Sequence, residues 1–485
     1  RITSHNPRTG EQVGEVVIAR PEDVRDAVAA ARKAAVEWAA LGPEGRKPHL
    51  KAFKGAIVAN LDHIVEVVQS ETGKHNDDVY LGDISPAVSL IDYYIRKGAK
   101  LLAPQRRGTW PFPWKKAWVE RHPRGVAGVI SPWNYPFGIP IEAAITALVA
   151  GNTVVVKPSD VTPLSGQLIA DLAEEAGLPE GVVQVVHGRV EAGEALIDSA
   201  DIVHFTGSPW TAKSIAKRAA ETLTPVILEL GGKDAMVVLD DANLDRAAKG
   251  AVWGSLFNAG QTCVSVERIY ADEAIYDKFL AKVEKEMDKV NAGAGDGSDI
   301  GAIIGPSQLD VIERHLSDAV AKGARIVTGG LPGEGPGQFF EPTLVVNVDH
   351  TMDLMTEETF GPVMAVMKVR NEQEALELAN DSRYGLHGSV WSRDKDRRRR
   401  FASAMRTGTV AANDVMINYA IPSLPFGGIG ESGYGSNFGP EGLDAFTYPK
   451  AITDGRVTTP REAWWFPRVG GRRVWRTLVR AIARK

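Results

Sequence analysis

The sequence has a single cysteine, Cys263, in 485 residues. An internal disulfide is therefore impossible, and nothing in the chain requires an oxidising compartment. No uninterrupted apolar run reaches the ~18 residues of a membrane span, and the first twenty residues lack the apolar core of a signal peptide. A net charge of −5 gives no electrostatic case for binding nucleic acid. We therefore expect a cytoplasmic globular protein.

At 485 residues and 52.3 kDa, the chain is long enough for two or three domains. From about residue 124, short β-branched runs alternate with helix-like stretches, as in GVAGVISPWN, PFGIPIEAAITALVAG and NTVVVKPS. This alternation predicts an α/β fold with a doubly wound parallel sheet that is covered by helices on both faces. In such sheets ligands bind beyond the carboxyl ends of the strands, which is where SPWN, KPSD and TGSPW fall.

A second alternating series begins near residue 232 and predicts a second α/β domain that ends at about residue 430. Residues 1–101 are expected to be mostly helical and to pack on the first sheet. Residues 102–123 depart from the pattern, because Pro and Gly bound short aromatic runs. They predict an extended hairpin too small to bury its own aromatic side chains, which either a partner subunit or the rest of the chain could cover. These side chains are Trp110, Phe112, Trp114 and Trp118.

The last thirty residues, 456–485, differ in charge from the rest of the chain. They hold eight Arg and one Lys against Glu462, a net charge of +8, which leaves −13 on residues 1–455. The pattern predicts a short basic amphipathic helix that could lie on an anionic membrane or on the acidic surface of a neighbouring subunit. Its basic side would comprise Arg472, Arg476, Arg480 and Arg484, and its apolar side Val474, Trp475, Leu478, Val479 and Ile482.

Cys263 follows Gly260-Gln261-Thr262, which predicts a turn. A lone cysteine is most often a small buried hydrophobic residue. A turn, however, can present both a sulfur atom and its backbone N–H to a ligand. Because a thiolate is a strong nucleophile, Cys263 is also a candidate catalytic residue.

Two further side chains end strand-like runs. Glu229, in TPVILELGGKD, is either a residue at the rim of the sheet or a buried carboxylate that could act as a general base. Asn134, in VISPWNYPF, is either an ordinary turn residue or a donor to a developing oxyanion.

The segment FTGSPWTAKSIAKRAAETL predicts a helix capped by Ser208, with Pro209 at the first helical position. The exposed N–H groups at that helix start would favour a phosphate, although Gly207 begins no full GxGxxG motif. Lys157 could reach the same phosphate or a ribose, and Asp160 could accept from a ribose hydroxyl. Either residue could instead be a solvated surface charge.

Together these motifs resemble the aldehyde dehydrogenase superfamily. SPWNYPF, KPSD, FTGS, LELGGKD, GQTC, EETFGPV and PFGGIGESGYG occur in that family's order, and 34 residues separate Glu229 from Cys263 as they do there. The ending PFGGIGESGYGSNFGPEGL resembles the branch that oxidises hydrophobic or aromatic aldehydes. The resemblance spans nearly the whole chain.

The resemblance implies NAD(P)-dependent oxidation of an aldehyde to a carboxylic acid. Cys263 would attack the aldehyde, Asn134 and the Cys263 N–H would hold the oxyanion, and Glu229 would activate water to hydrolyse a thioester. The pocket aromatics would be Tyr135, Phe257 and Phe426, and no metal ligands are predicted. The cofactor site would comprise Trp133, Lys157, Ser159, Asp160, Gly207, Ser208, Leu230, Glu358 and Phe360.

The resemblance also implies a domain division. Residues 1–101 and 124–231 would form a Rossmann-like dinucleotide-binding domain, and residues 232–430 the catalytic domain. Residues 102–123 and 431–455 would form a small β element that joins subunits into a homodimer or homotetramer. Residues 456–485 would remain a separate basic, aromatic tail that contacts a subunit or the periphery of a membrane.

Several positions depart from the family pattern. Ala212 stands where many members have glycine, next to a bulky Trp210, so we expect a phosphate site of altered geometry. Pro440 replaces a glutamate found in some relatives, which argues against a second proton relay.

Two acidic residues predict the cofactor and the substrate. Asp160 would repel a 2′-phosphate, which predicts NAD rather than NADP. Glu142 stands where semialdehyde dehydrogenases often have arginine, which predicts a hydrophobic aldehyde rather than succinic semialdehyde.

Other functions remain to be weighed. A semialdehyde dehydrogenase of the same family is the alternative within this class, and a noncatalytic structural protein on the same fold is the alternative outside it. An acylating dehydrogenase typically lacks the glutamate found here at Glu229, and a thioesterase would not need the dinucleotide site.

Overall fold

The computed structural model describes residues 1–293, 298–333, 337–456, 460–462, 464–466 and 471–483. Its first sheet has six strands in the order β17-β9-β8-β5-β6-β7, parallel except for β17. The central strands are apolar and buried along their whole length, as expected where helices cover both faces. The strands are β5 (Val126–Ile130), β6 (Thr153–Lys157), β7 (Val183–Val185), β8 (Ile202–Gly207), β9 (Val226–Leu230) and β17 (Gly433–Tyr434).

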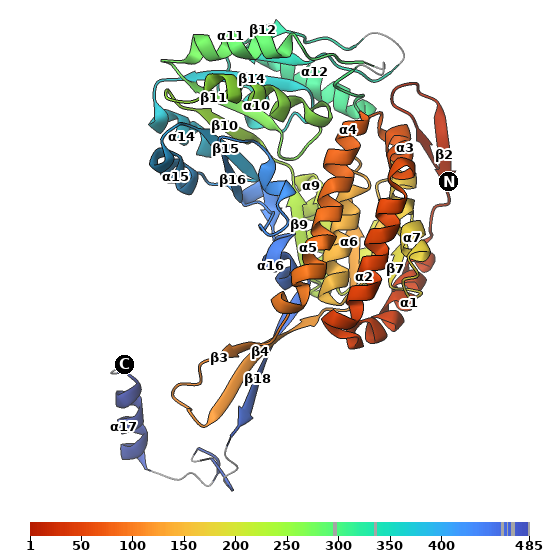
Figure 1. The fold of residues 1–485 in the computed structure, drawn as a ribbon, viewed down its shortest axis with the longest axis vertical. Helices are drawn as coiled ribbons and strands as arrows, with labels where there is room; N and C mark the ends of the chain where they lie inside the picture. Colours follow the sequence, from red (N-terminus) through yellow and green to blue (C-terminus); the bar gives the residue numbers. More distant parts are fainter. Residues whose placement is uncertain (294–297, 334–336, 457–459, 463, 467–470, 484–485) are drawn as a thin grey trace.

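Helices cover both faces of this sheet, so the predicted doubly wound arrangement is confirmed (Figure 1). One face packs on α1 (Pro21–Ala40), α8 (Val190–Ser199) and α9 (Pro209–Thr222), which share a separate hydrophobic core with the sheet. The other face packs on helices that include most of residues 42–101, as predicted. These are α2 (Gly42–Ala59), α3 (Leu61–Thr72), α4 (Asn76–Asp78), the π-helix η1 (Val79–Ile84), α5 (Ser85–Leu101), α6 (Gly138–Ala150) and α7 (Pro163–Glu175).

The chain reverses direction across the sheet between β5 and β8. From β5 it runs outward through β6 to β7, then returns to place β8 and β9 on the other side of β5. The loops after β5 and β8 therefore diverge and leave a crevice at their carboxyl ends, which is where ligands bind in open α/β sheets. The predicted cap of α9 is also confirmed, because Ser208 Oγ accepts from the Thr211 N–H at 3.3 Å.

The second sheet has seven strands in the order β12-β13-β14-β11-β10-β15-β16, parallel except for β12. Its strands are β10 (Asp234–Val238), β11 (Val266–Asp272), β12 (Arg325–Thr328), β13 (Thr343–Val346), β14 (Val363–Val369), β15 (His387–Trp391) and β16 (Thr409–Ala412). Its helices are α10 (Leu244–Leu256), η2 (Phe257–Gly260), α11 (Tyr276–Met287), α12 (Pro306–Ala321), α13 (Asp353–Thr356), α14 (Glu372–Asn380), α15 (Lys395–Ala404) and η3 (Ile417–Ala420).

A third sheet projects from the body (Figure 1) and consists of β3 (Gln105–Arg107), β4 (Lys115–Pro123) and β18 (Thr447–Gly455). The predicted hairpin is therefore present, but residues 431–446 do not extend it. They form η4 (Gly430–Ser432), α16 (Gly439–Ala445) and β17, which pairs with Glu229 and Leu228 in the first sheet. The sequence analysis also missed the N-terminal pair β1 (Ile2–His5) and β2 (Gln12–Val16).

The tail forms α17 (Arg472–Ile482), a helix none of whose residues is buried. Trp464 packs against Phe112 and Trp114 of the projecting hairpin, at ring-centroid distances of 5.4 Å and 6.5 Å. The chain's own tail thus covers part of the aromatic hairpin. Arg484 lies outside the described residues. Among the helices that are described, none combines the length and the apolar character needed to cross a lipid bilayer.

Candidate active site

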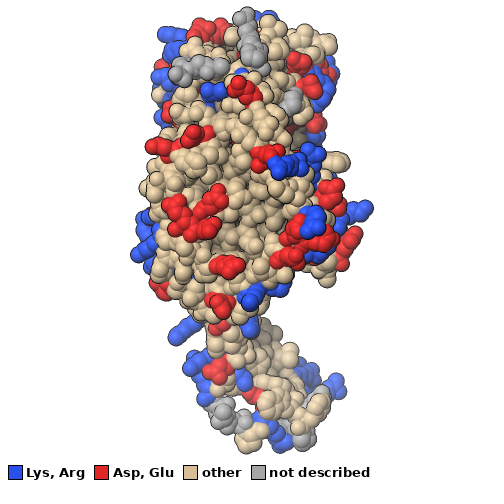
Figure 2. All heavy atoms as spheres, turned by 90° about the vertical axis from the view of Figure 1, so that its right-hand side faces the viewer, with Lys and Arg blue, Asp and Glu red and all other residues tan. Residues whose placement is uncertain are grey.

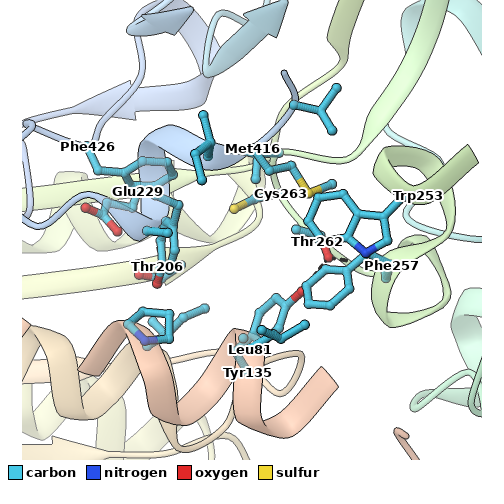
Figure 3. Close-up of a pocket in the computed structure, with 18 of the residues that line it drawn as sticks. Leu81, Tyr135, Thr206, Glu229, Trp253, Phe257, Thr262, Cys263, Met416 and Phe426 are labelled. Atoms are coloured by element: carbon cyan, nitrogen blue, oxygen red, sulfur yellow. Dashed lines mark hydrogen bonds between the residues drawn. The ribbon is translucent and has the colours of Figure 1, made fainter. Parts of the chain in front are cut away.

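A cavity of about 250 Å³ lies between the two α/β units, and both Cys263 and Glu229 line it (Figure 3). Glu229 belongs to β9 and Cys263 to the loop between η2 and β11. These two residues, which are far apart in the sequence, therefore lie at one site, and Cys263 is a partly exposed residue that lines the cavity. Thr206, near the end of β8, lines this cavity and also the crevice at the strand-order reversal.

The predicted turn before Cys263 has an unusual backbone. Asn258, Ala259 and Gly260 all adopt left-handed conformations, with φ of 53°, 56° and 72°. At Gly260 a side chain is also excluded by space, because a Cβ would lie 2.0 Å from the Gly361 carbonyl oxygen. The left-handed conformation of Ala259 costs about 1–2 kcal/mol, which the surrounding contacts must offset.

Buried amide side chains hold this turn. Asn134 Nδ2 donates to the Gln261 carbonyl at 3.0 Å, and Asn258 Nδ2 donates to the carbonyls of Asn134 and Gln261 at 3.2 Å and 3.1 Å. Gln261 in turn donates to the carbonyls of Asn258 and Ala302. Asn134 is thus tied to the loop that carries Cys263, and an amide group has a second N–H to offer.

Cys263 lies among carboxyl groups. Burial raises the pKa of its thiol well above the ordinary value, and the negative charges of Asp234, Glu358 and Glu229 raise it further. The resting side chain is therefore a neutral thiol at pH 7.

Apolar side chains form most of the cavity wall, including the three predicted aromatics. Tyr135 stacks on Phe257 at a centroid distance of 6.4 Å, and its hydroxyl shares a 2.6 Å hydrogen bond with Thr262 Oγ1. Phe426 packs edge-on against Tyr419 at 4.9 Å. The sequence analysis missed Tyr419 and several other lining residues, because no motif marks them. They include Leu81, Pro86, Ile139, Trp253, Met416 and Ile417.

Glu142 lies behind this wall. Its side chain is fully buried, accepts a hydrogen bond from the Tyr419 hydroxyl, and is not among the residues that line the cavity. Burial raises its pKa well above the ordinary value. The expectation that Glu142 directly repels an anionic substrate is therefore not supported by its position.

The crevice at the strand-order reversal has a volume of about 750 Å³. The predicted cofactor residues that line it are Trp133, Lys157, Ser159, Asp160, Gly207 and Ser208. Of the remaining three, Leu230 lines the neighbouring cavity, while Glu358 and Phe360 lie nearby on the loop before β14. The sequence analysis missed Arg189, whose guanidinium Nε lies 3.5 Å from the Asp160 carboxylate.

The floor of the crevice is suited to a nucleotide. The Oγ atoms of Ser131 and Thr206 are buried and have no hydrogen-bond partner within the described part of the chain, so both could bind a ligand. Gly207 provides room for a close approach, because a Cβ there would lie 2.5 Å from the Phe205 ring. The dipole at the start of α9 and the backbone N–H of Trp210 favour an anion such as a pyrophosphate. Trp210 lies at the start of α9 and is 79% exposed.

Lys157 is buried, and its ammonium group donates to the carbonyls of Pro158 and Gly188 at 2.9 Å and 3.1 Å. Burial lowers its pKa, while the nearby Asp160 carboxylate opposes that shift. Lys157 is therefore held in place at the end of β6, whereas Asp160 is partly exposed at the crevice.

Glu358 lies close enough to Cys263 for its charge to raise the thiol pKa, and Phe360 packs on the crevice residue Trp133. Glu358 accepts from the Gly232 N–H at 2.9 Å, and burial raises its pKa to about 8. The ring of Phe360 meets that of Trp133 edge-on at 5.6 Å. No cluster of three or more His, Cys, Asp or Glu side chains with the geometry of a metal site occurs in the described ranges.

A nucleotide-type crevice that opens onto a pocket with a thiol and a carboxylate is typical of an oxidoreductase with a covalent step. The model of the "Aldehyde dehydrogenase family" matches residues 1–452. The chain belongs to the aldehyde dehydrogenase family, and it is an NAD(P)-dependent enzyme of that family.

Curated relatives carry different substrate names. The chain is 40% identical over 469 residues to the 4,4'-diapolycopene aldehyde oxidase of Methylomonas sp, covering 96% of this chain and 88% of the relative. It is 37% identical over 456 residues to a putative succinate-semialdehyde dehydrogenase [NADP(+)] of Mycolicibacterium smegmatis, covering 93% of this chain and 88% of the relative.

Solved structures share the whole fold. A Mycobacterium tuberculosis aldehyde dehydrogenase complexed with NAD+ matches with a TM-score of 0.89 and 36% identity, covering 93% of this chain and 94% of that one. Betaine aldehyde dehydrogenase from Staphylococcus aureus in complex with NAD+ matches with a TM-score of 0.90 and 33% identity, covering 96% of this chain and 93% of that one.

The raised pKa of Cys263 predicts how its reactivity depends on pH. Iodoacetamide should alkylate Cys263 more rapidly as the pH increases, because only the thiolate reacts. Since the thiol pKa is raised, the alkylation rate should still be rising above pH 9. Mass spectrometry measures the rate without interference, since the chain has no other cysteine. Cys263→Ser should not be alkylated at all. A rate that levels off below pH 8 would show that the thiol ionises easily.

Proposed function

We propose that this protein oxidises an uncharged hydrophobic or aromatic aldehyde to the carboxylic acid, with NAD(P)+ as oxidant and a thioester on Cys263 as intermediate. The observation that carries the proposal is the shared apolar cavity of Cys263 and Glu229, which adjoins the nucleotide crevice at Thr206. A nucleophile, a base and a hydride acceptor could then meet at one carbon atom.

In this proposal the Cys263 thiol first releases its proton to solvent, and the resulting thiolate attacks the aldehyde carbon. The Cys263 N–H and the second N–H of Asn134 stabilise the oxyanion that forms, because the Asn134 amide is hydrogen-bonded to the loop that carries Cys263. A bound NAD(P)+ would supply the hydride acceptor for this oxidation. Glu229 then takes a proton from water, which attacks the thioester carbon and releases the acid and the Cys263 thiolate.

The chain's own residues would hold the cofactor as follows. Lys157 and Asp160 would bind the adenosine ribose. Ser208 and the start of α9 would bind the pyrophosphate, and Glu358 would bind the nicotinamide ribose. Asp160 supports a preference for NAD, since a 2′-phosphate nearby would be repelled. Arg189 offsets only part of this charge, because the pair is solvent-exposed, with side-chain exposures of 64% and 44%.

The apolar cavity supports the hydrophobic substrate class. The name of the Methylomonas relative, which specifies a polyene aldehyde, agrees with it. The alternative, a semialdehyde dehydrogenase, is favoured by the names of the mycobacterial relatives. Within the cavity lining, however, no lysine or arginine is present to bind a substrate carboxylate.

A hydrophobic aldehyde such as benzaldehyde should produce NADH absorbance with the purified protein. Cys263→Ala should abolish the signal, and Glu229→Gln should lower kcat by about 10²–10⁴-fold because the general base is lost. Asn134→Ala should lower kcat by about 10²–10³-fold through the loss of an oxyanion donor. If a broad aldehyde panel gives no signal with the wild type, the noncatalytic alternative is favoured.

A substrate and cofactor panel tests the finer assignment. We expect higher kcat/KM for benzaldehyde and medium-chain aliphatic aldehydes than for succinic semialdehyde, and higher kcat/KM with NAD than with NADP. Asp160→Asn should narrow the cofactor preference, because it removes the charge that opposes the 2′-phosphate. A higher kcat/KM for succinic semialdehyde, or for NADP, would contradict the corresponding half of the proposal.

We propose that the projecting sheet, formed by residues 102–123 and 447–455, is the oligomerisation element of a homodimer or homotetramer. Trp110 and Phe112 support this, because they are 58% and 39% exposed in the loop that connects β3 to β4, and the small sheet has little core of its own. We also propose residues 1–101 and 124–231 as the dinucleotide-binding domain and residues 232–430 as the catalytic domain, as the two large sheets suggest.

We further propose that the tail can contact an anionic membrane surface from the cytoplasmic side. Figure 2 shows basic side chains on the narrow lower extension of the molecule. Arg472, Arg476 and Arg480 recur along α17, whereas Val474 and Val479 are 56% and 64% exposed. Trp465 and Phe466 add exposed aromatic surface close by. This combination suits the interface of an anionic bilayer.

Vesicle co-sedimentation tests the tail. The full chain should bind vesicles that contain phosphatidylserine and bind phosphatidylcholine vesicles much less, and binding should fall with salt. A chain that ends at residue 455 should not bind. Leu478→Ser with Val479→Ser should weaken binding without changing the net charge. Equal partitioning of the full and shortened chains, together with a changed oligomer size, would assign the tail to a subunit contact.

A further inference from the structure

A buried histidine lies next to Glu229 and takes no part in the proposed steps. His204, in β8, is fully buried, and its Nε2 lies 3.9 Å from Glu229 Oε2. Neither ring nitrogen of His204 nor Glu229 Oε1 has a hydrogen-bond partner among the residues that the structure describes. Burying polar atoms without partners is costly, so this pairing calls for a functional explanation.

The strand register sets the arrangement. In the parallel pair of β8 and β9, Thr206 lies opposite Glu229 and His204 opposite Ile227. Residues two apart on a strand share a face, so His204, Thr206 and Glu229 lie on the same side of the sheet. Phe446, which follows α16, stacks on the imidazole at a centroid distance of 6.0 Å and an interplanar angle of 17°. This stacking restricts the orientation of the ring.

Four titratable groups surround Glu229, each from a different element. His204 belongs to β8, Glu142 to α6, Tyr419 to η3 and Cys263 to the loop after η2. The Tyr419 hydroxyl already donates to Glu142. In this group, His204 is the residue with a nitrogen donor that could stabilise an ionised Glu229.

We propose that His204 is a positioning residue for Glu229: its Nε2–H donates to the Glu229 carboxylate and keeps that carboxylate ionised and directed at the thioester. The two atoms are 3.9 Å apart in the structure, which is longer than a hydrogen bond, so the proposal requires the Glu229 side chain to move toward the imidazole. This inference rests on the proposed role of Glu229 as the base.

An aryl ester substrate allows hydrolysis of the thioester on Cys263 to be measured without cofactor. p-Nitrophenyl acetate transfers its acetyl group to Cys263: an S–C bond forms, the bond between the carbonyl carbon and the ester oxygen breaks, and p-nitrophenolate leaves with the electron pair. Water then attacks the thioester carbon and passes a proton to Glu229, and the C–S bond breaks to return the thiolate. The burst of p-nitrophenolate reports acylation, and the steady rate reports hydrolysis when acylation is the faster step.

His204→Phe should leave the burst amplitude unchanged and lower the steady rate about tenfold at pH 7. The pH of half-maximal hydrolysis should move upward by about one unit, because a donor to the ionised base is lost. His204→Gln, which keeps an N–H donor, should restore most of the wild-type rate and pH profile.

Ile227→Val is the matched packing control. It removes a methylene group from the buried residue opposite His204, so it should lower thermal stability slightly and leave the pH profile unchanged. The proposal is overturned if the profile of His204→Phe superimposes on that of the wild type, or if Ile227→Val shifts the profile equally.

A spectroscopic measurement covers the case in which His204→Phe does not fold. With ¹⁵N-labelled histidine, the Nε2 resonance that disappears in His204→Gln should shift when Glu229 is replaced by Gln; an unchanged resonance also overturns the proposal. If Glu229→Gln still hydrolyses the acyl-enzyme at the wild-type rate, Glu229 is not the base, and it is the proposed function that fails.

Discussion

The active site depends on the conformation of the turn that carries Cys263. Three consecutive left-handed residues, at 258–260, would not persist in an isolated peptide, since Ala259 gains nothing from this conformation on its own. The turn is stabilised by the buried amides of Asn134, Asn258 and Gln261, which link the loop after β5 to the loop before β11. The position of the sulfur is therefore set by hydrogen bonds that cross between the two α/β units.

This constraint explains why the site lies where the two large sheets meet. The loops after β5 and β8 form the crevice for the nucleotide, and the loop before β11 supplies the thiol from the second sheet. Thr206 belongs to the wall of both spaces, so a ligand in the crevice and one in the cavity would be neighbours. Neither unit alone contains the cavity, because its lining comes from both.

The sequence predicted those parts of the structure that local patterns encode. Alternating strand and helix patterns identified the doubly wound sheet, and the motifs around Cys263 and Glu229 identified two residues that share the cavity. Residues that act through tertiary position carried no such signal. Leu81, from a π-helix, and Trp253, from a helix distant in the sequence, both line the cavity. Strand β17, near the C-terminal end of the chain, joins the first sheet. Glu142 was expected in contact with substrate, but the burial of its helix places it behind Tyr419.

The loop before β14 shows why motifs do not identify the residues that hold the site residues in place. Phe360 has a φ of 52°, and the backbone N–H groups of Thr359 and Phe360 donate to the Glu267 carboxylate, which also pairs with the buried Lys233. A buried ion pair adds little net stability, because desolvation offsets the attraction, but its geometry is specific. Here that geometry holds Glu358 against the Gly232 N–H beside the thiol. The precision of the site therefore comes from residues that touch neither substrate nor cofactor, and their spacing in the chain has no regular period.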